Sequence, residues 1–70
     1  MIKKVITVYL DWDLMESLNK VTNLSPFETD NWCDKASFEA YPSLYEFLNN
    51  EEKEILNKNE IDFVVFRVDK

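Results

Sequence analysis

Two segments, one near each end of the chain, carry the side-chain alternation of β-strands. The first, residues 5–10, divides into one face with Ile6, Val8 and Leu10 and another with Val5, Thr7 and Tyr9. The second, residues 61–68, reads IDFVVFRV and is rich in β-branched and aromatic residues. Both of its faces are apolar, so this strand is predicted either to lie at the covered centre of a sheet or to form a dimer interface.

Helix signals follow the first strand. Asp13 and Glu16 have the spacing of a capping box and predict a helix start at that point. The apolar side chains that share one face of this helix are Leu14, Leu18 and Val21. Asn23 is a plausible stop for it.

The middle of the chain gives weaker signals. Ser25-Pro26-Phe27-Glu28 predicts one short helical turn, because Ser can cap a helix and Pro suits its first position. Residues 36–41 alternate weakly and predict a short edge strand that Pro42 ends. Residues 43–46 form another capping-box pattern, which predicts a helix that runs to Asn59 and can break at Asn49-Asn50.

Together these signals predict a single α+β domain over residues 1–70. The expected architecture is a small sheet that pairs the N-terminal and C-terminal strands, with two main helices on one face. A chain of 70 residues has a modest core, and with one cysteine and no histidine it can use neither an intrachain disulfide nor the usual zinc ligand sets. Good packing, for which 46% hydrophobic residues suffice, or self-association must stabilise it.

Residues 3–21, KKVITVYLDWDLMESLNKV, place a strand, an Asp turn and a helix start in succession. This opening resembles that of the ribbon-helix-helix DNA-binding proteins. In that family a strand ribbon from a dimer enters the major groove, where outward side chains read the base edges. Here that face offers Val5, Thr7 and Tyr9, of which only Thr7 suits the role. A prompt second helix does not follow, so DNA reading of this kind is a remote alternative.

The net charge narrows the range of partners. Acidic residues outnumber basic ones by 14 to 8, which gives a formal charge of −6 and a pI near 4.4. Because affinity for DNA comes largely from Lys and Arg on phosphates, this balance argues against direct binding to nucleic acid or to an anionic membrane. A basic protein is the natural partner of such a surface. The alternative is that the charge serves only solubility.

The sequence predicts a cytoplasmic location and no bound cofactor. Asp11 and Asp13 interrupt the apolar start before any signal-peptide cleavage site, and no stretch reaches the roughly 18 apolar residues of a membrane span. A lone cysteine without an export signal fits a reducing cytoplasm. The chain contains no glycine, so it has no phosphate-binding loop.

Catalytic and metal-binding roles are not expected. Cys33 has no histidine base, and its acidic neighbours Asp30 and Asp34 should raise its thiol pKa, so a packing role is predicted. Glu28, Asp30 and Asp34 have a loose calcium-loop spacing, but the glycine and the terminal glutamate of such a loop are missing. Carboxylate pairs in so small a domain are expected to be solvated rather than catalytic.

One pattern occurs twice. Trp12 lies between Asp11 and Asp13, and Trp32 lies between Asp30 and Asp34. An exposed indole flanked by carboxylates suits a Lys or Arg side chain, because the ring takes the stem and the cation while the acids take the charge. The alternative is that both indoles complete the core and the acids hydrate its rim. The predicted binding residues are Asp11, Trp12, Asp13, Glu28, Asp30, Trp32 and Asp34.

These observations favour a non-enzymatic acidic module that binds and antagonises a basic, nucleic-acid-binding protein. In size and charge the chain is similar to the small acidic inhibitors of phages and mobile elements, some of which mimic DNA or block host defence. The alternative is a structural or regulatory homodimer assembled through the C-terminal strand.

Overall fold

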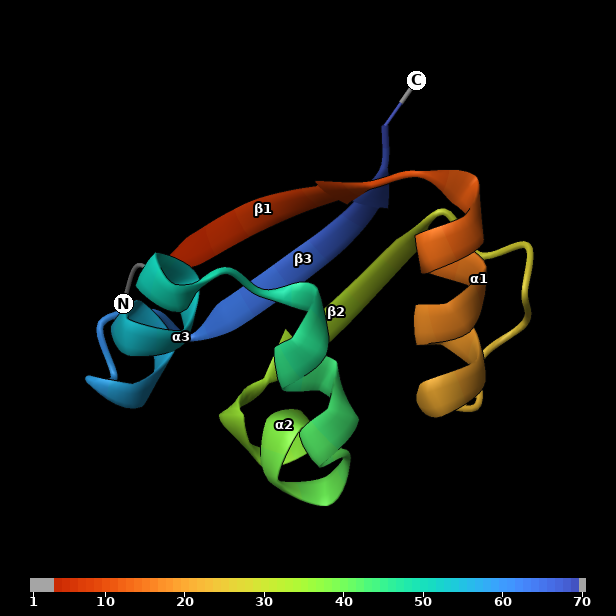
Figure 1. Ribbon diagram of the computed structural model, residues 1–70. Coiled ribbons are helices and arrows are strands. Elements are labelled where there is room, and N and C mark those ends of the chain that lie inside the picture. The colour runs from red at the N-terminus through yellow and green to blue at the C-terminus, as the bar shows by residue number, and fades with distance from the viewer. Residues whose placement is uncertain (1–3, 70) are drawn as a thin grey trace.

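The computed structural model describes residues 4–69 and contains one three-stranded mixed sheet (Figure 1). Its strands are β1 (Val5–Leu10), β2 (Asp30–Asp34) and β3 (Phe63–Val68), in the order β1-β3-β2. β3 runs parallel to β1 and antiparallel to β2. The predicted α+β class and the pairing of the two end strands are therefore confirmed.

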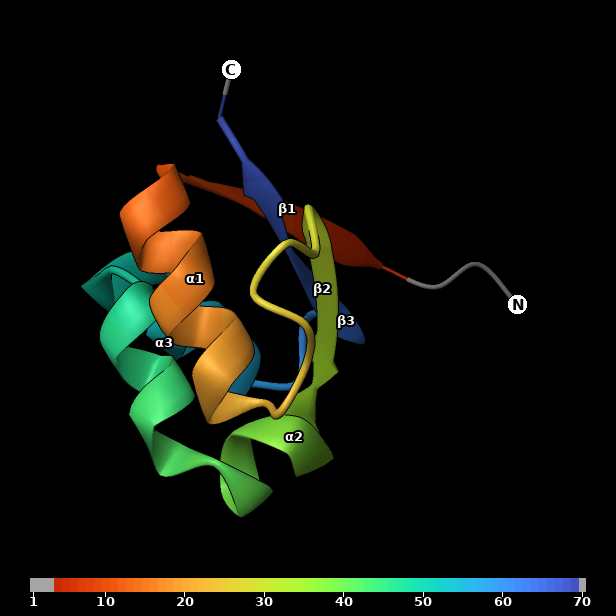
Figure 2. The same cartoon turned by 90° about the vertical axis from the view of Figure 1, so that its right-hand side faces the viewer.

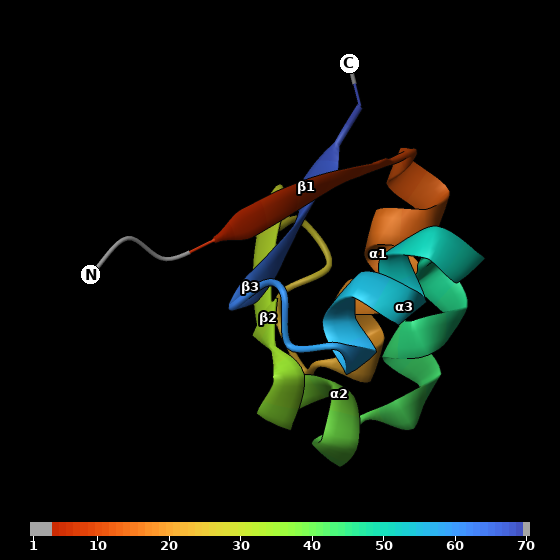
Figure 3. The ribbon, with the colours of Figure 1, turned by 90° about the vertical axis from the view of Figure 1, so that its left-hand side faces the viewer.

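The helical segments all lie on one side of this sheet, as Figures 2 and 3 show from opposite directions. They are α1 (Trp12–Val21), α2 (Lys35–Ala40), the 3₁₀ helix η1 (Pro42–Phe47) and α3 (Asn50–Asn57). Within residues 4–69 no helix has the length and apolar character needed to cross a membrane.

The core lies between the sheet and the helices. The covered face of the sheet carries Val8, Leu10, Cys33, Val64 and Phe66, all buried. The helical side contributes side chains with no exposed surface, namely Met15, Leu18, Phe38, Leu44 and Leu56. The Phe66 ring lies 6.3 Å from the centroids of both Phe38 and Phe47, so the aromatic packing joins the central strand to two helical segments.

The central position of β3 explains its two apolar faces. Both of its edges are occupied, by β1 and by β2, and the face with Val64 and Phe66 packs into the chain's own core. Of the two predicted positions for this strand, the covered centre of a sheet is the one observed, and Val64 and Phe66 are not available to a second chain. Only the opposite face of β3, with Phe63, Val65 and Arg67, is left for contacts outside the domain.

The first helix begins earlier than predicted. Asp11, not Asp13, is its N-cap, and the Asp11 carboxylate accepts a hydrogen bond from the Leu14 amide at 2.8 Å. The buried face also differs from the predicted one, because α1 packs on the sheet with Met15 and Leu18 inward and leaves Leu14 exposed. The predicted stop is confirmed, because the helix ends at Val21 and Asn23 adopts a left-handed φ of 63°.

The predicted edge strand at residues 36–41 is wrong. This segment forms α2, because the Asp34 carboxylate caps it by accepting from the Ser37 amide, and Phe38 is its one buried side chain. The third strand lies just before it, at Asp30–Asp34, where Asn31 and Cys33 point into the core. The short helical turn expected after Ser25 is also wrong, since residues 26–27 form a turn and no helix.

The predicted break in the last helical segment is confirmed. η1 ends before Asn49, and α3 then begins with a capping box in which Asn49 and Glu52 exchange hydrogen bonds of 2.8 Å. The box expected at Ser43 is absent, because η1 has no side-chain cap and starts at Pro42. Asn59, with a φ of 59°, reverses the chain after α3.

A polar network fastens the segment between α1 and β2 to both elements. The Asn31 side-chain amide donates to Asn19 Oδ1 at 3.2 Å and to Thr22 Oγ1 at 2.7 Å. Asn19 in turn donates to the Glu28 carbonyl at 2.9 Å, and the Cys33 thiol donates to Asn31 Oδ1 at 3.4 Å. Because every described buried side-chain polar atom has a partner, these two asparagines are tolerated in the core.

Candidate functional site

The side of the sheet that carries no helix presents one continuous set of side chains. Strand register places them in three rows across β1, β3 and β2. We call this surface the open face; its members are Val5, Phe63 and Asp34, then Thr7, Val65 and Trp32, then Tyr9, Arg67 and Asp30. It combines apolar and aromatic groups with two carboxylates, whereas the covered face is almost entirely apolar.

Trp32 is the largest side chain of the open face. Its position in β2, between the inward-pointing Asn31 and Cys33, directs the indole outward, and 59% of the residue is exposed. The ring meets Phe63 edge-on, with centroids 6.0 Å apart and planes at 70°. Val65 lies between Trp32 and Thr7 in the register and is only 3% exposed. Trp32 is therefore anchored on an apolar base while most of its ring remains free.

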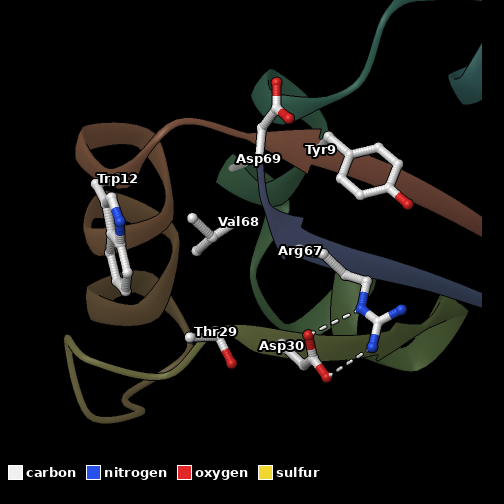
Figure 4. Close-up of a pocket in the computed structure, with 7 residues that line it drawn as sticks. All are labelled: Tyr9, Trp12, Thr29, Asp30, Arg67, Val68 and Asp69. Carbon is white, nitrogen blue, oxygen red and sulfur yellow. Dashed lines mark hydrogen bonds and ion pairs between the residues drawn. The ribbon is translucent and has the colours of Figure 1, made fainter.

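Trp12 occupies a second position, at the first turn of α1, and is 52% exposed. It lines an open pocket where α1 meets the end of the sheet (Figure 4). In Figure 4 the Trp12 ring stands on one side of this pocket, Tyr9 and Arg67 stand on the other, and Val68 lies between them. The remaining lining residues are Thr29, Asp30 and Asp69.

Arg67 is held by Asp30 across the two paired strands. Its Nε and Nη2 atoms donate to the two carboxylate oxygens at 3.0 and 3.4 Å (Figure 4). This hydrogen bonding, followed by the charge of Asp30, raises the pKa of the Arg67 guanidinium. Such an exposed pair adds little stability, but it fixes the guanidinium against β2. Asp69 also lines the pocket and adds a further carboxylate to this neutral pair.

Two of the predicted acidic residues have local structural roles. Asp11 caps α1 and Asp34 caps α2. The Ser37 amide, and then the Ser37 hydroxyl at 2.9 Å, lower the pKa of the Asp34 carboxyl. Because these hydrogen bonds stabilise the ionised form, Asp34 keeps its negative charge at neutral pH and contributes to the surface potential.

The structure brings some of the seven predicted residues together and leaves others apart. Asp30 lines the pocket beside Trp12 and also belongs to the open face with Trp32, so it joins the two aromatic positions. Asp34 lies at the other end of the open face. Asp11, Asp13 and Glu28 are exposed but line neither the pocket nor the open face.

Sequence reasoning missed Tyr9, Arg67 and Asp69 as members of this surface. Tyr9 is 63% exposed and pairs with Arg67 in the register. A signal for Tyr9 was present, because it shares the outward face of the first strand with Val5 and Thr7. Its place beside Arg67 depends on pairing between the two ends of the chain, which no local pattern reveals.

Cys33 is a packing residue, as predicted. It belongs to the core, and burial, with a smaller contribution from the Asp34 charge, raises its thiol pKa to about 11. The sequence indicated the contribution of the acidic neighbour, whereas burial is the larger cause.

The described part of the chain holds no group of three or more His, Cys, Asp or Glu side chains placed to bind a metal ion. A comparison of the chain with protein-family models, with curated proteins and with solved structures found no match.

Proposed function

We propose that this protein is a non-enzymatic module that binds a basic segment of another protein, and that the open face and the adjoining Trp12 pocket form the contact surface. The observation that carries this proposal is the exposure of Tyr9 and Trp32 in one face with the carboxylates of Asp30 and Asp34. Both residues lie on paired strands, and the Trp32 ring also packs against Phe63, so their positions are largely set before binding. Rigid aromatic anchors of this kind dominate the binding energy of many protein interfaces.

The charges of the surface select a cationic partner. The described surface carries three carboxylates, those of Asp30, Asp34 and Asp69, and one cation, Arg67. Arg67 is already paired with Asp30. A Lys or Arg side chain laid over the Trp32 ring would have a carboxylate in each neighbouring row, Asp34 on one side and Asp30 on the other. A nucleic acid backbone would instead meet net repulsion, since the whole molecule carries a charge of −6.

A nucleic-acid-binding protein is the partner class that best fits these properties, because its phosphate-binding surface is both basic and exposed. In this proposal the module acts as an antagonist that occupies that surface in place of DNA or RNA, as phage-type DNA mimics and anti-defence proteins do.

The test uses oligo-lysine and oligo-arginine peptides as probes and oligo-glutamate as the control peptide. Titrations followed by NMR should perturb the indole N–H resonances of Trp12 and Trp32 and the amides of β2 and β3. Trp32→Ala should weaken binding by roughly 10- to 30-fold, since a hot-spot aromatic contributes about 2 kcal/mol. Its thermal melt should stay close to the parent's, because most of the ring is exposed.

Phe27→Ala supplies a matched control, since Phe27 is an exposed aromatic outside the open face. This variant should bind the basic peptides as the parent does. Asp34→Asn removes a charge and leaves an amide oxygen to cap α2, so it should slow association without unfolding the helix. Binding that is equal for lysine and glutamate peptides, or shifts confined to α3, would refute the proposed surface.

A further inference from the structure

The outer edge of β1 takes no part in the proposed binding of a basic segment. Among residues 4–69, β1 has one neighbouring strand, β3, and it lies at the margin of the sheet (Figure 1). The Phe63 amide donates to the Lys4 carbonyl, and the Asp69 amide donates to the Leu10 carbonyl at 2.8 Å. Because hydrogen-bonding direction alternates along a strand, the even-numbered residues face β3. The N–H and C=O groups of Val5, Thr7 and Tyr9 therefore point to the free edge.

This edge lacks the usual protection against pairing with another strand. Natural edge strands carry charged side chains, proline or a bulge, each of which discourages pairing. β1 reads VITVYL and contains no charged residue and no proline, and its register with β3 is continuous from Val5 to Leu10. The opposite edge of the sheet differs, because the corresponding outward residues of β2 include Asp30 and Asp34.

We infer that the β1 edge binds a second copy of this chain, with the two β1 strands antiparallel and centred on Thr7. This register pairs Thr7 with its own symmetry mate and pairs Val5 with Tyr9 of the other copy. The backbone groups of Val5, Thr7 and Tyr9 point to the free edge, so each of these residues then both donates to and accepts from its partner in the other copy. The result is one continuous sheet through both copies, related by the two-fold symmetry that isologous dimers require.

Side chains fit the same register. On the open face, Val5 meets the Tyr9 ring of the other copy, and such β-branched and aromatic cross-strand pairs are stabilising. On the covered face, Ile6 lies opposite Val8 of the other copy.

The net charge of the molecule also favours this edge for self-association. Two copies that each carry a charge of −6 repel one another, and the repulsion is smallest where the contact surface is itself uncharged. A foreign extended peptide could pair with the same edge, but the match of Thr7 with itself and of Val5 with Tyr9 is a property of two identical strands. This inference does not depend on the proposed basic partner, because it uses the strand edge.

The experiment combines sedimentation with amide hydrogen exchange on the whole chain over a wide concentration range. The parent should pass from monomer to dimer as its concentration rises. In step with that change, the amides of Val5, Thr7 and Tyr9 should become protected. The amides of Ile6, Val8 and Leu10 should be protected at all concentrations, because they already bond to β3.

Two substitutions at the centre of the edge test the register. Thr7→Pro removes the backbone N–H of residue 7, which makes no hydrogen bond to β3 but is needed at the centre of the dimer contact. This variant should therefore be a folded monomer. Thr7→Lys places two like charges directly opposite each other at the symmetry axis and should weaken dimerisation at least 10-fold. Ser43→Lys, on the exposed surface of η1, adds the same charge away from the edge and should leave dimerisation unchanged.

Each outcome decides the inference. A parent that stays monomeric at millimolar concentration would overturn it. A dimer that Thr7→Lys leaves intact, or one in which the Val5, Thr7 and Tyr9 amides exchange freely, would also overturn it by showing that the copies meet elsewhere. If Thr7→Pro fails to fold, the exchange pattern of the parent and the Thr7→Lys variant still decide the question.

Discussion

At the scale of single residues, Cys33 couples the stability of the fold to alkaline pH. Its folded pKa of about 11 lies above its ordinary value of 9.0, because burial disfavours the thiolate. The stability that this thiol contributes is therefore fully present below pH 9 and is lost as the pH rises towards 11. The free energy of unfolding should fall over that window by on the order of 2 kcal/mol more in the parent than in Cys33→Val.

Denaturant titrations at several pH values measure this difference directly, and the Val variant accounts for the Lys and Tyr groups that titrate in the same window. A parallel check is the reaction of the thiol with Ellman's reagent at pH 8. The reaction should be slow in the folded protein and rapid after unfolding, since the core shields Cys33. Equal pH dependence in both proteins would contradict the shifted pKa.

A second prediction at this scale concerns the buried asparagine pair. Asn31→Val removes the amide that donates to Asn19 and Thr22, and it leaves the side-chain Oδ1 of Asn19 buried without this partner. The expected loss of stability is roughly 1–3 kcal/mol, the desolvation penalty of an unsatisfied polar group. Asn57→Ala, on the exposed end of α3, is the control and should change stability by about 0.5 kcal/mol or less. Thermal melts of the two variants provide the comparison.

At the scale of elements, the sequence predicted what is locally periodic and missed what depends on distant pairing. β1 was predictable because its apolar side chains alternate with more polar ones, and β3 because it is rich in β-branched and aromatic residues. β2 could not be predicted, because three of the five residues in DNWCD are polar. One of them, Asn31, is buried only because the folded chain supplies its hydrogen-bond partners. The exposure of Trp12 and Trp32 likewise depends on where their elements dock. The edge strand at residues 36–41 was predicted wrongly because Ala36 and Ala40 were counted as one apolar face of a strand. Both are exposed in α2.

The capping role of Asp34 gives a test of this boundary between β2 and α2. Asp34→Ala should cost about 1 kcal/mol of stability, because it removes the acceptor of the Ser37 amide and hydroxyl. Asp34→Asn retains an acceptor oxygen and should cost less. Since the pKa of Asp34 is lowered in the folded state, its charge contributes stability above its ordinary pKa of 3.8, and this is lost as the pH falls through the folded value. Melts of both variants at neutral and acidic pH separate the cap from the charge.

At the scale of the whole molecule, salt should affect stability and binding in opposite directions. The described ion pairs, Lys20–Glu16, Lys58–Glu54 and Arg67–Asp30, are all at the surface and contribute little stability. The excess of 14 acidic over 8 basic residues therefore dominates, and screening should relieve its repulsion. Stabilisation on the order of 1 kcal/mol would raise the melting temperature by about 4–8 °C between low and high salt. At a pH near the pI of 4.4, where the net charge vanishes, the same salt should have little effect.

Binding to oligo-lysine should weaken over the same salt range, because there the charges of the two partners attract. Self-association through the uncharged β1 edge should strengthen, since screening reduces the repulsion between two acidic copies. One series of salt concentrations thus separates the proposed interactions: melting and dimerisation rise together while peptide binding falls. A melting temperature that falls with salt would show that attractive ion pairs outweigh the net repulsion. Peptide binding that does not respond to salt would show that the acidic surface does not select the partner.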